Sequence, residues 1–233
     1  MSSHPSAAPL PLGTEVFDRR LLLDDAWRLY VDAPKALRLK QRLRVLVCPF
    51  EEVVGFVPKG SSVLDIGCGS GLSLALMAAR GREIEGHGFD PSEVAIGLAQ
   101  EMTKHLAGSG STLHYEHRDA RREWPDRQFD VVSMQDVIHH VPVASQREVF
   151  DKACRAVRPG GIFIYKDMSL RPRWRNFFCR VHDLIIAREW IYPIPVAEVE
   201  GWAAENGLTV EVAKTAHRVV YGNDLRVFRK AAR

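Results

Sequence analysis

The chain has 233 residues, of which 46% are hydrophobic and 26% charged, proportions that are typical of globular domains. This composition excludes a disordered, a collagen-like or a disulfide-scaffold protein, and the length suits one α/β domain with additions. The 32 basic and 29 acidic residues leave a formal net charge of +3, which is too small to indicate nucleic-acid binding by itself.

The cysteines and the first residues bear on the cellular compartment. Cys48, Cys68, Cys154 and Cys179 show no CxxC spacing, which favours free thiols in a reducing cytosol, and no metal site is expected. The N-terminal sequence lacks the features of a signal peptide, and no apolar run approaches the roughly 18 residues that span a bilayer. We therefore expect a soluble, cytoplasmic protein.

The N-terminal region is predicted to hold a tail and a helix. Residues 1–13 are rich in proline and serine and have little to bury, so we expect a disordered tail without a functional site. A helix is predicted over 14–30, where Phe17, Leu21 and Trp27 would be its buried apolar anchors.

A second helix, predicted over 35–47, is strongly basic. Its expected core-facing stripe consists of Ala36, Leu39, Leu43, Leu46 and Val47. The other faces carry Lys35, Arg38, Lys40, Arg42 and Arg44, and no acid lies between residues 33 and 50. Two interpretations remain open, a solvated face on a core-packed helix and a contact with an anionic substrate or a membrane surface.

Short apolar runs alternate with helical patterns from residue 61 onward. Strands are predicted over 62–66, 84–89, 112–117, 129–134 and 161–165, and helices over 72–80, 92–106 and 145–157. Helices over 172–190 and 196–206 follow, the second ended by Gly207, and then strands over 208–213 and 225–229. Strands separated by helices predict βαβ units and a doubly wound α/β fold with a parallel sheet.

The most informative motif is VLDIGCGSG, from Val63 to Gly71, in which a buried strand enters a glycine-rich turn. Glycines at this turn of a doubly wound sheet let the backbone approach a nucleotide-like ligand. The dinucleotide fingerprint GxGxxG would need glycine where the chain has Leu72. Asp65 would also repel a pyrophosphate but suits a ligand with an ammonium and a sulfonium. The motif therefore favours S-adenosylmethionine over NAD.

Two further acids follow the next two strands. Asp90 stands nineteen residues after Gly71, where a carboxylate can accept hydrogen bonds from both ribose hydroxyls of an adenosyl group. Asp119 ends the third strand and could accept a hydrogen bond from the adenine amino group. Any one of these acids could instead cap a helix, but three acids at three successive strand ends favour a ligand site.

Residues 50–167 resemble a class I S-adenosylmethionine-dependent methyltransferase of the small-molecule, ubiquinone/menaquinone-biosynthesis-like group. The motifs VLDIGCGSG, GFDPS, RDA, FDVVSMQDVIHHV and VRPGG carry this resemblance in order and spacing. It implies a Rossmann-like seven-stranded sheet whose last strand is antiparallel. It also implies a cofactor site made by Asp65, Gly67, Gly69, Gly71, Asp90, Asp119, Ala120 and Gln135, with Cys68 and Pro91 as their neighbours in the same loops.

The candidate catalytic residues follow the fourth and fifth strands. Methyl transfer is an in-line displacement, so positioning supplies much of the acceleration, but a hydroxyl acceptor also needs a base. His140, or failing it His139, is expected to be that base, since both would lie at the mouth between methyl donor and acceptor. Asp167 could orient the histidine or bind the acceptor. Packing or surface roles are the alternative for each of these residues.

Two features bear on the substrate class, a motif that the chain lacks and a helical segment that follows the predicted fifth strand. The sequence QDVI at 135–138 differs from the (D/N/S)PP(Y/F) motif of amino-methylating nucleic-acid enzymes, so no nucleic-acid partner is expected. The predicted helix 172–190 carries an apolar stripe of Trp174, Phe177, Phe178, Val181, Leu184 and Ile185. The stripe fits a core-facing helix, or the wall of a pocket for an aromatic, polyketide, isoprenoid or lipid-like acceptor.

We therefore predict one methyltransferase domain over 14–233, with N-terminal helices over 14–57 and a helical lid over 168–206. O-methylation of a small, largely apolar acceptor is preferred and C-methylation is next. An NAD-dependent oxidoreductase and a catalytically idle S-adenosylmethionine-binding protein are the other hypotheses. If the N-terminal helices belong to the lid, removing residues 1–33 should spare cofactor binding.

Overall fold

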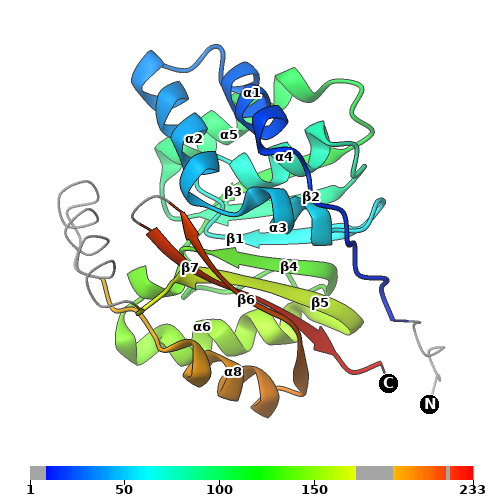
Figure 1. Cartoon of the computed structure of the whole chain (residues 1–233), viewed down its shortest axis with the longest axis vertical. Helices are drawn as coiled ribbons and strands as arrows, with labels where there is room; N and C mark the ends of the chain where they lie inside the picture. The colour runs from blue at the N-terminus through cyan, green and yellow to red at the C-terminus, as the bar shows by residue number, and fades with distance from the viewer. Residues whose placement is uncertain (1–8, 172–190, 219–220, 233) are drawn as a thin grey trace.

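The computed structural model describes residues 9–171, 191–218 and 221–232, and within them seven strands form one sheet in the order β3-β2-β1-β4-β5-β7-β6 (Figure 1). The strands are β1 (Ser62–Ile66), β2 (Glu85–Asp90), β3 (Thr112–His117), β4 (Phe129–Gln135), β5 (Val157–Met168), β6 (Leu208–Arg218) and β7 (Tyr221–Lys230). Strand β7 runs antiparallel to both of its neighbours, and the remaining pairs are parallel. This confirms the predicted seven-stranded Rossmann-like fold.

Helices cover both faces of the sheet. They are α1 (Arg19–Leu29), α2 (Lys35–Val47), α3 (Phe50–Phe56), α4 (Leu72–Ala79), α5 (Glu93–Thr103), α6 (Val143–Ala156) and α8 (Val196–Glu205), with single 3₁₀ turns at Lys104–Leu106 and Ile138–His140. In Figure 1 the helices α1 to α5 lie on one side of the sheet, and α6 and α8 lie on the other. The predicted helix 172–190 lies outside the described residues.

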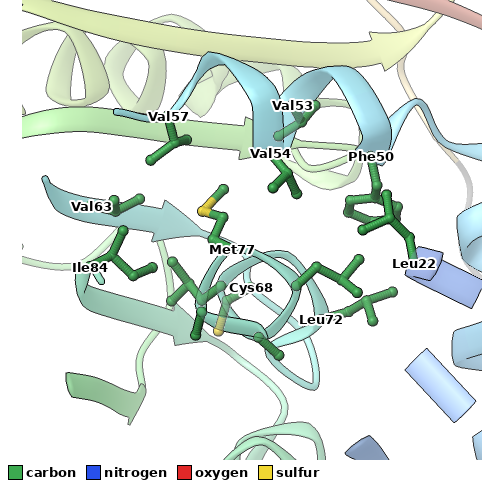
Figure 2. Packing of buried hydrophobic residues seen from close by; sticks show 14 of the residues in the cluster. Leu22, Phe50, Val53, Val54, Val57, Val63, Cys68, Leu72, Met77 and Ile84 are labelled. Atoms are coloured by element: carbon green, nitrogen blue, oxygen red, sulfur yellow. The ribbon is translucent and has the colours of Figure 1, made fainter. Parts of the chain in front are cut away.

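Alternation along β1 divides the core between the two faces. Val63 packs under α3 and α4, whereas Leu64 points to the opposite cluster under α6. Figure 2 shows Val54 of α3, and Val57 just after that helix, in the same cluster as Val63 and Met77. A strand buried on both faces must be apolar at nearly every position, which makes Asp65 in β1 exceptional.

The predicted elements differ from the structure mainly at their ends. Strand β5 begins at Val157 rather than at 161, because an irregularity in its pairing with β4 lets the RPGG sequence continue the strand. Strand β6 extends to Arg218 rather than to 213, and its exposed, polar second half gave no apolar signal. Gly207 follows α8 with a φ of +74°, as expected of a helix-ending glycine.

Two of the three predicted anchors of the first helix are wrong, whereas Phe17, which lies just before the helix, packs against the hydrophobic cluster. The helix begins at Arg19 behind the cap residue Asp18, whose carboxylate accepts a hydrogen bond from the backbone of Arg20. Its buried residues include Leu22 and Leu29, while Leu21 and Trp27 are exposed. The buried face of α1 differs from the predicted one because the helix packs on α2, α3 and α4 together.

The predicted core-facing stripe of α2 is also wrong for its leucines, although Val47 at its end packs against the hydrophobic cluster. Leu39, Leu43 and Leu46 point to solvent, and the buried residues of the helix are Gln41 and Val45. The most apolar face of α2 is therefore not the face that packs on the protein.

The N-terminal segment is better anchored than expected. Residues 9–13 are held against the rest of the protein by backbone hydrogen bonds. The N–H of Leu10 donates to the carbonyl of Gly160, and the N–H of Gly13 donates to the carbonyl of Phe56. Helix α3 was not predicted as a separate element. It passes so close to the N-terminal segment that a Cβ on Gly55 would lie 1.7 Å from the carbonyl oxygen of Glu15.

Candidate active site

A cavity of about 350 Å³ opens at the carboxyl ends of the central strands. Its walls come from α2, the glycine loop after β1, the ends of β2, β4 and β5, and the start of β7. They are Lys40, Arg44, Val47, Cys48, Gly67, Gly69, Asp90, Gln135, Asp136, His139, His140, Lys166, Met168, Tyr221, Gly222 and Asn223. Six of the residues predicted from the sequence thus line one cavity, because the carboxyl ends of parallel strands meet at one edge of a sheet.

The glycine loop has its geometry fixed by neighbouring side chains. Gly67, Gly69 and Gly71 all have positive φ, between 55° and 80°. A Cβ on Gly67 would lie 2.5 Å from Val137, and one on Gly71 would lie 2.6 Å from the Tyr115 hydroxyl. A Cβ on Gly69 would meet only the Arg44 guanidinium, at 3.7 Å, so this part of the loop is open to the cavity.

Two buried tyrosines hold the same loop from behind. The Tyr30 hydroxyl donates to the carbonyl of Ser70 at 2.7 Å, and the Tyr115 hydroxyl donates to that of Gly71 at 3.3 Å. Since Tyr30 follows α1, the N-terminal helices contact the glycine loop directly. Periodicity in the sequence gives no signal for such a long-range contact.

Asp90 lies at the end of β2, beside the loop. Its carboxylate accepts hydrogen bonds from the backbone N–H groups of Gly69 and Ser92, both at 2.9 Å. The residue lines the cavity, so oxygen lone pairs beyond these two bonds can accept from hydroxyl groups placed there.

Other predicted cofactor residues lie away from the cavity wall. Asp119 is bound by the side chain and backbone of Arg121, whose hydrogen bonds hold the pKa of the Asp119 carboxyl below its usual value. Ala120 is buried beside Trp124, which donates to its carbonyl, and Pro91 is exposed. The structure therefore does not bring Asp119, Ala120 or Pro91 into the cavity described above.

Asp65 is a buried carboxyl with an unsatisfied oxygen. A narrow recess beside the cavity is lined by Asp65, Cys68, Gln135 and Arg44 among others. Burial raises the pKa of Asp65 to about 7, against the opposing effects of a Ser133 hydrogen bond and the Arg44 charge. Its Oδ2 has no hydrogen-bond partner within the described residues. An unpaired buried carboxyl oxygen is costly, and a cationic group of a ligand would satisfy it.

Gln135 adds a second unsatisfied oxygen to this region. Its amide nitrogen donates to the hydroxyls of Ser73 at 2.7 Å and Ser133 at 2.9 Å, which fixes the orientation of the amide. The amide oxygen has no partner among the described groups, although it is buried. The loop, Asp90 and these two oxygens together fit a ligand that carries hydroxyls and an ammonium, as S-adenosylmethionine does.

Arg44 is a residue that the sequence indicated only as part of a basic face. Its guanidinium lies between the recess and the main cavity, and lines both. The nearby Asp136, Asp65 and Cys48 raise its pKa despite the opposing effect of burial, so it stays charged. A charged guanidinium beside the glycine loop can bind a carboxylate.

His139 and Asp167 form a buried pair. The Nδ1 atom of His139 is hydrogen-bonded to Oδ1 of Asp167, and both side chains are almost fully buried. Asp167 also accepts from the Met168 backbone at 2.6 Å and from the Tyr165 hydroxyl at 3.4 Å, so its position is fixed. His140 is exposed, and its ring packs on that of His139 with 4.3 Å between centroids. A carboxylate on Nδ1 makes Nε2 the nitrogen of His139 that can take a proton.

A second charged pair forms part of the cavity wall. The Lys166 ammonium lies 2.6 Å from both carboxylate oxygens of Asp136 and 3.5 Å from the sulfur of Cys48. Although burial opposes it, the Lys166 charge holds the pKa of Asp136 at about 2. Asp136 has a φ of +56°, which is rare outside glycine, and its N–H donates to the carbonyl of Lys166. The pair thereby fixes the turn that leads to His139.

In the part of the chain that the structure describes, no cluster of three or more histidine, cysteine or acidic side chains could hold a metal ion. No helix in those ranges is long and apolar enough to cross a membrane.

Comparisons with known sequences agree with the motifs. A family model described as a methyltransferase domain matches residues 39–212. A ubiquinone biosynthesis O-methyltransferase from Pseudomonas fluorescens is 31% identical over 166 residues, covering 65% of this chain and 66% of that protein. One of the same name from Aromatoleum aromaticum is 36% identical over 121 residues, covering 51% of this chain and 46% of that protein. The chain matches about two thirds or less of the length of these two relatives.

Solved structures share the fold. Magnesium protoporphyrin IX methyltransferase from Synechocystis with bound SAH superposes with a TM-score of 0.66 at 19% identity, over 92% of this chain and 100% of that chain. An O-methyltransferase family protein from Burkholderia thailandensis gives 0.62 at 17% identity, over 92% and 70%. At these identities the likeness concerns the fold alone, and the family match confirms the resemblance read from the motifs.

Proposed function

We propose that this chain, which belongs to the methyltransferase domain family and is S-adenosylmethionine-dependent, transfers a methyl group to a hydroxyl of a small, largely apolar acceptor. The observation that carries the proposal is that Asp90 and the glycine loop share one cavity with His139, which Asp167 supports from behind. One cavity then holds a donor site and a proton acceptor. The curated relatives, named as O-methyltransferases, support the choice of oxygen.

The donor would be held by the residues around the loop. Asp90 accepts from the ribose hydroxyls, Asp65 faces the ammonium and Arg44 binds the carboxylate, with the backbone of Gly67 and Gly69 along the ligand. S-adenosylmethionine supplies the methyl group as an electrophile on sulfur. Opposite charges placed against each end of its amino-acid part would fix its direction in the cavity.

The base step concerns this chain's own residues. His139 takes the acceptor hydroxyl proton as the oxygen forms its bond to the methyl carbon and the carbon–sulfur bond breaks. Asp167 stabilises the imidazolium that results, because its carboxylate bonds to Nδ1. The same base would serve C-methylation at a ring carbon beside a phenol, so the position of the new methyl group distinguishes the two reactions.

The acceptor class can be tested with a set of phenols that differ in the length of an apolar substituent. We expect the chain to release S-adenosylhomocysteine with these phenols, and mass spectrometry of the product should place the methyl group on oxygen. Turnover of hydrophilic amines alone would contradict the proposal. Binding of S-adenosylhomocysteine without any turnover would favour the idle binding protein, and binding of NADH instead would favour an oxidoreductase.

Replacing Asp90 by alanine should weaken S-adenosylmethionine binding by roughly ten- to a hundredfold, because hydrogen bonds to a charged acceptor contribute about 1.5 to 3 kcal/mol. Titration calorimetry measures this directly. Asp126→Ala, at an exposed acid that does not line this cavity, is the matched control and should bind like the wild type. Unchanged affinity in Asp90→Ala would remove the ribose role from this residue.

Cofactor binding should release a proton and tighten with rising pH. Asp65 has a pKa of about 7, so it is largely protonated in the free protein at pH 6, and a bound ammonium favours the carboxylate. The affinity should therefore rise by up to about tenfold per pH unit between about pH 5 and 7. Calorimetry in two buffers with different ionisation heats counts the protons. Asp65→Asn should show neither effect, and a wild type that releases no proton would contradict the prediction.

The apolar character of the proposed acceptor bears on where in the cell the enzyme would work. An apolar acceptor partitions into lipid, so the enzyme would meet it at a membrane surface, which is one of the two interpretations that the sequence left open for the basic helix 35–47. The cysteines in the described residues, Cys48, Cys68 and Cys154, are free, which supports a reducing, cytoplasmic compartment.

A further inference from the structure

The outward face of α2 is unusually apolar for a solvent-exposed surface. Leu39, Leu43 and Leu46 are exposed to 48%, 49% and 36%. Their spacing of four and three residues places them on one stripe, opposite the buried residues Gln41 and Val45. We call these three leucines the leucine ridge. Single exposed leucines are ordinary, but a continuous ridge on one helix indicates a contact surface.

Positive charges surround the leucine ridge. No acid occurs between residues 33 and 50, whereas Lys35 and Arg42 lie on one side of the ridge and Lys40 on the other. Arg38 stacks on the half-exposed Trp27 of α1, with its guanidinium carbon 3.8 Å from the ring centroid. Among the described residues, the carboxylate of Asp24 in α1 lies 3.9 Å from Arg42. An apolar ridge between cations is typical of a helix that lies in a membrane interface.

The leucine ridge lies next to the active-site cavity. Lys40, Arg44 and Val47 line the cavity, and each is one residue further along α2 than a leucine of the ridge. One helix thus presents the ridge to solvent and a polar wall to the cavity. In Figure 1, α2 lies in the helical layer on the same side of the sheet as α1.

We propose that α2 docks the enzyme on an anionic membrane surface, with the leucine ridge inserted among the lipids and its cations against the headgroups. This deepens the proposed function, because docking through α2 would bring the cavity close to an acceptor dissolved in the bilayer. Charge complementarity favours lipid over a protein partner. Three leucines are also a small area beside the roughly 800 Å² per partner that a stable protein interface buries.

The test is sedimentation of the full chain with vesicles, without any acceptor. The vesicles contain phosphatidylcholine alone or a mixture with phosphatidylglycerol. The ridge variant replaces Leu39, Leu43 and Leu46 by glutamine. The control variant replaces Val94, Val143 and Val210, which are exposed valines on other elements, by glutamine. Affinity for S-adenosylmethionine shows that each variant is folded, since none of these side chains touches the donor site.

We expect the wild type and the control variant to bind the anionic vesicles, less so in high salt, and the ridge variant to bind them roughly a hundredfold more weakly. A wild type that stays in the supernatant, or a ridge variant that sediments like the wild type, would overturn the proposal. So would a concentration-dependent dimer that only the ridge variant fails to form. The vesicle experiment does not measure methyl transfer, so the two proposals can fail separately. If the chain binds anionic vesicles but methylates no phenol, the proposed function is rejected and the proposed docking through α2 stands.

Discussion

Alanine in place of His139 should lower the turnover number by roughly 10²- to 10⁴-fold, the usual contribution of a positioned general base. Affinity for S-adenosylmethionine should stay within about twofold, because the imidazole is proposed to act on the acceptor and not to hold the donor. In the wild type the rate should fall on the acid side as the histidine becomes protonated. The variant should lose this acidic limb, which a merely structural defect would leave in place.

Two further variants separate the roles of the neighbouring residues. Asp167→Asn keeps the shape of the pair but removes the charge that stabilises an imidazolium, so its turnover should fall in the same direction as that of His139→Ala. His140→Ala is the matched control, since His140 lines the same cavity but is exposed. If His140→Ala is the variant that loses turnover, the base is the exposed histidine. If every variant keeps full turnover, positioning of donor and acceptor is sufficient.

The central fold could be predicted because its signals are local. Strands β1 and β3 begin and end where predicted, since β1 is a short apolar run and β3 alternates apolar with polar residues, and polar turn residues or glycine bound both. The same locality explains the donor site. Gly67, Gly69 and Asp90 each follow a strand, and a parallel sheet brings such positions together without further information.

The residues that were missed depend on packing between distant segments. Arg44 reaches the cavity only because α2 packs beside the carboxyl ends of the strands, a contact that no spacing in the sequence encodes. For the same reason periodicity predicts that the leucines of α2 face the core, whereas the helix buries the face that carries Val45. The sequence places His139 and His140 side by side after the fourth strand, and only the structure shows that the ring of His139 meets Asp167.

Removing residues 1–33 should unfold the protein, or leave it unable to bind S-adenosylmethionine. This reverses the expectation that the first helix is a dispensable lid. Leu22, Ala26 and Leu29 of α1, with Tyr30 after it, belong to the main hydrophobic cluster and are at most 2% exposed. The larger of these side chains contribute about 1.5 to 3 kcal/mol each when buried, so their loss approaches the roughly 5 to 15 kcal/mol that stabilises a whole domain.

The truncation would also leave charged and polar groups without partners. Buried Asp25 accepts from Arg28 at 3.0 Å and lies 2.5 Å from Arg80 of the remaining fold, which would lose its carboxylate. The Ser70 carbonyl in the glycine loop would lose the Tyr30 hydroxyl. A buried acceptor left unsatisfied costs about 1 to 3 kcal/mol, so the loop should lose its fixed geometry together with the helix.

Thermal unfolding and titration calorimetry of three variants distinguish a core role of the N-terminal helix from a lid role. The truncated chain should show no cooperative transition near that of the wild type and no measurable donor affinity. Tyr30→Phe keeps the ring and removes only the hydroxyl, so it should remain folded but bind the donor several-fold more weakly, since a hydrogen bond contributes about 0.5 to 1.5 kcal/mol. Leu21→Ala, at an exposed position of the same helix, should change neither property. If the truncated chain melts cooperatively, binds the donor and loses only methyl transfer, the result would support the hypothesis that the N-terminal helix is a lid.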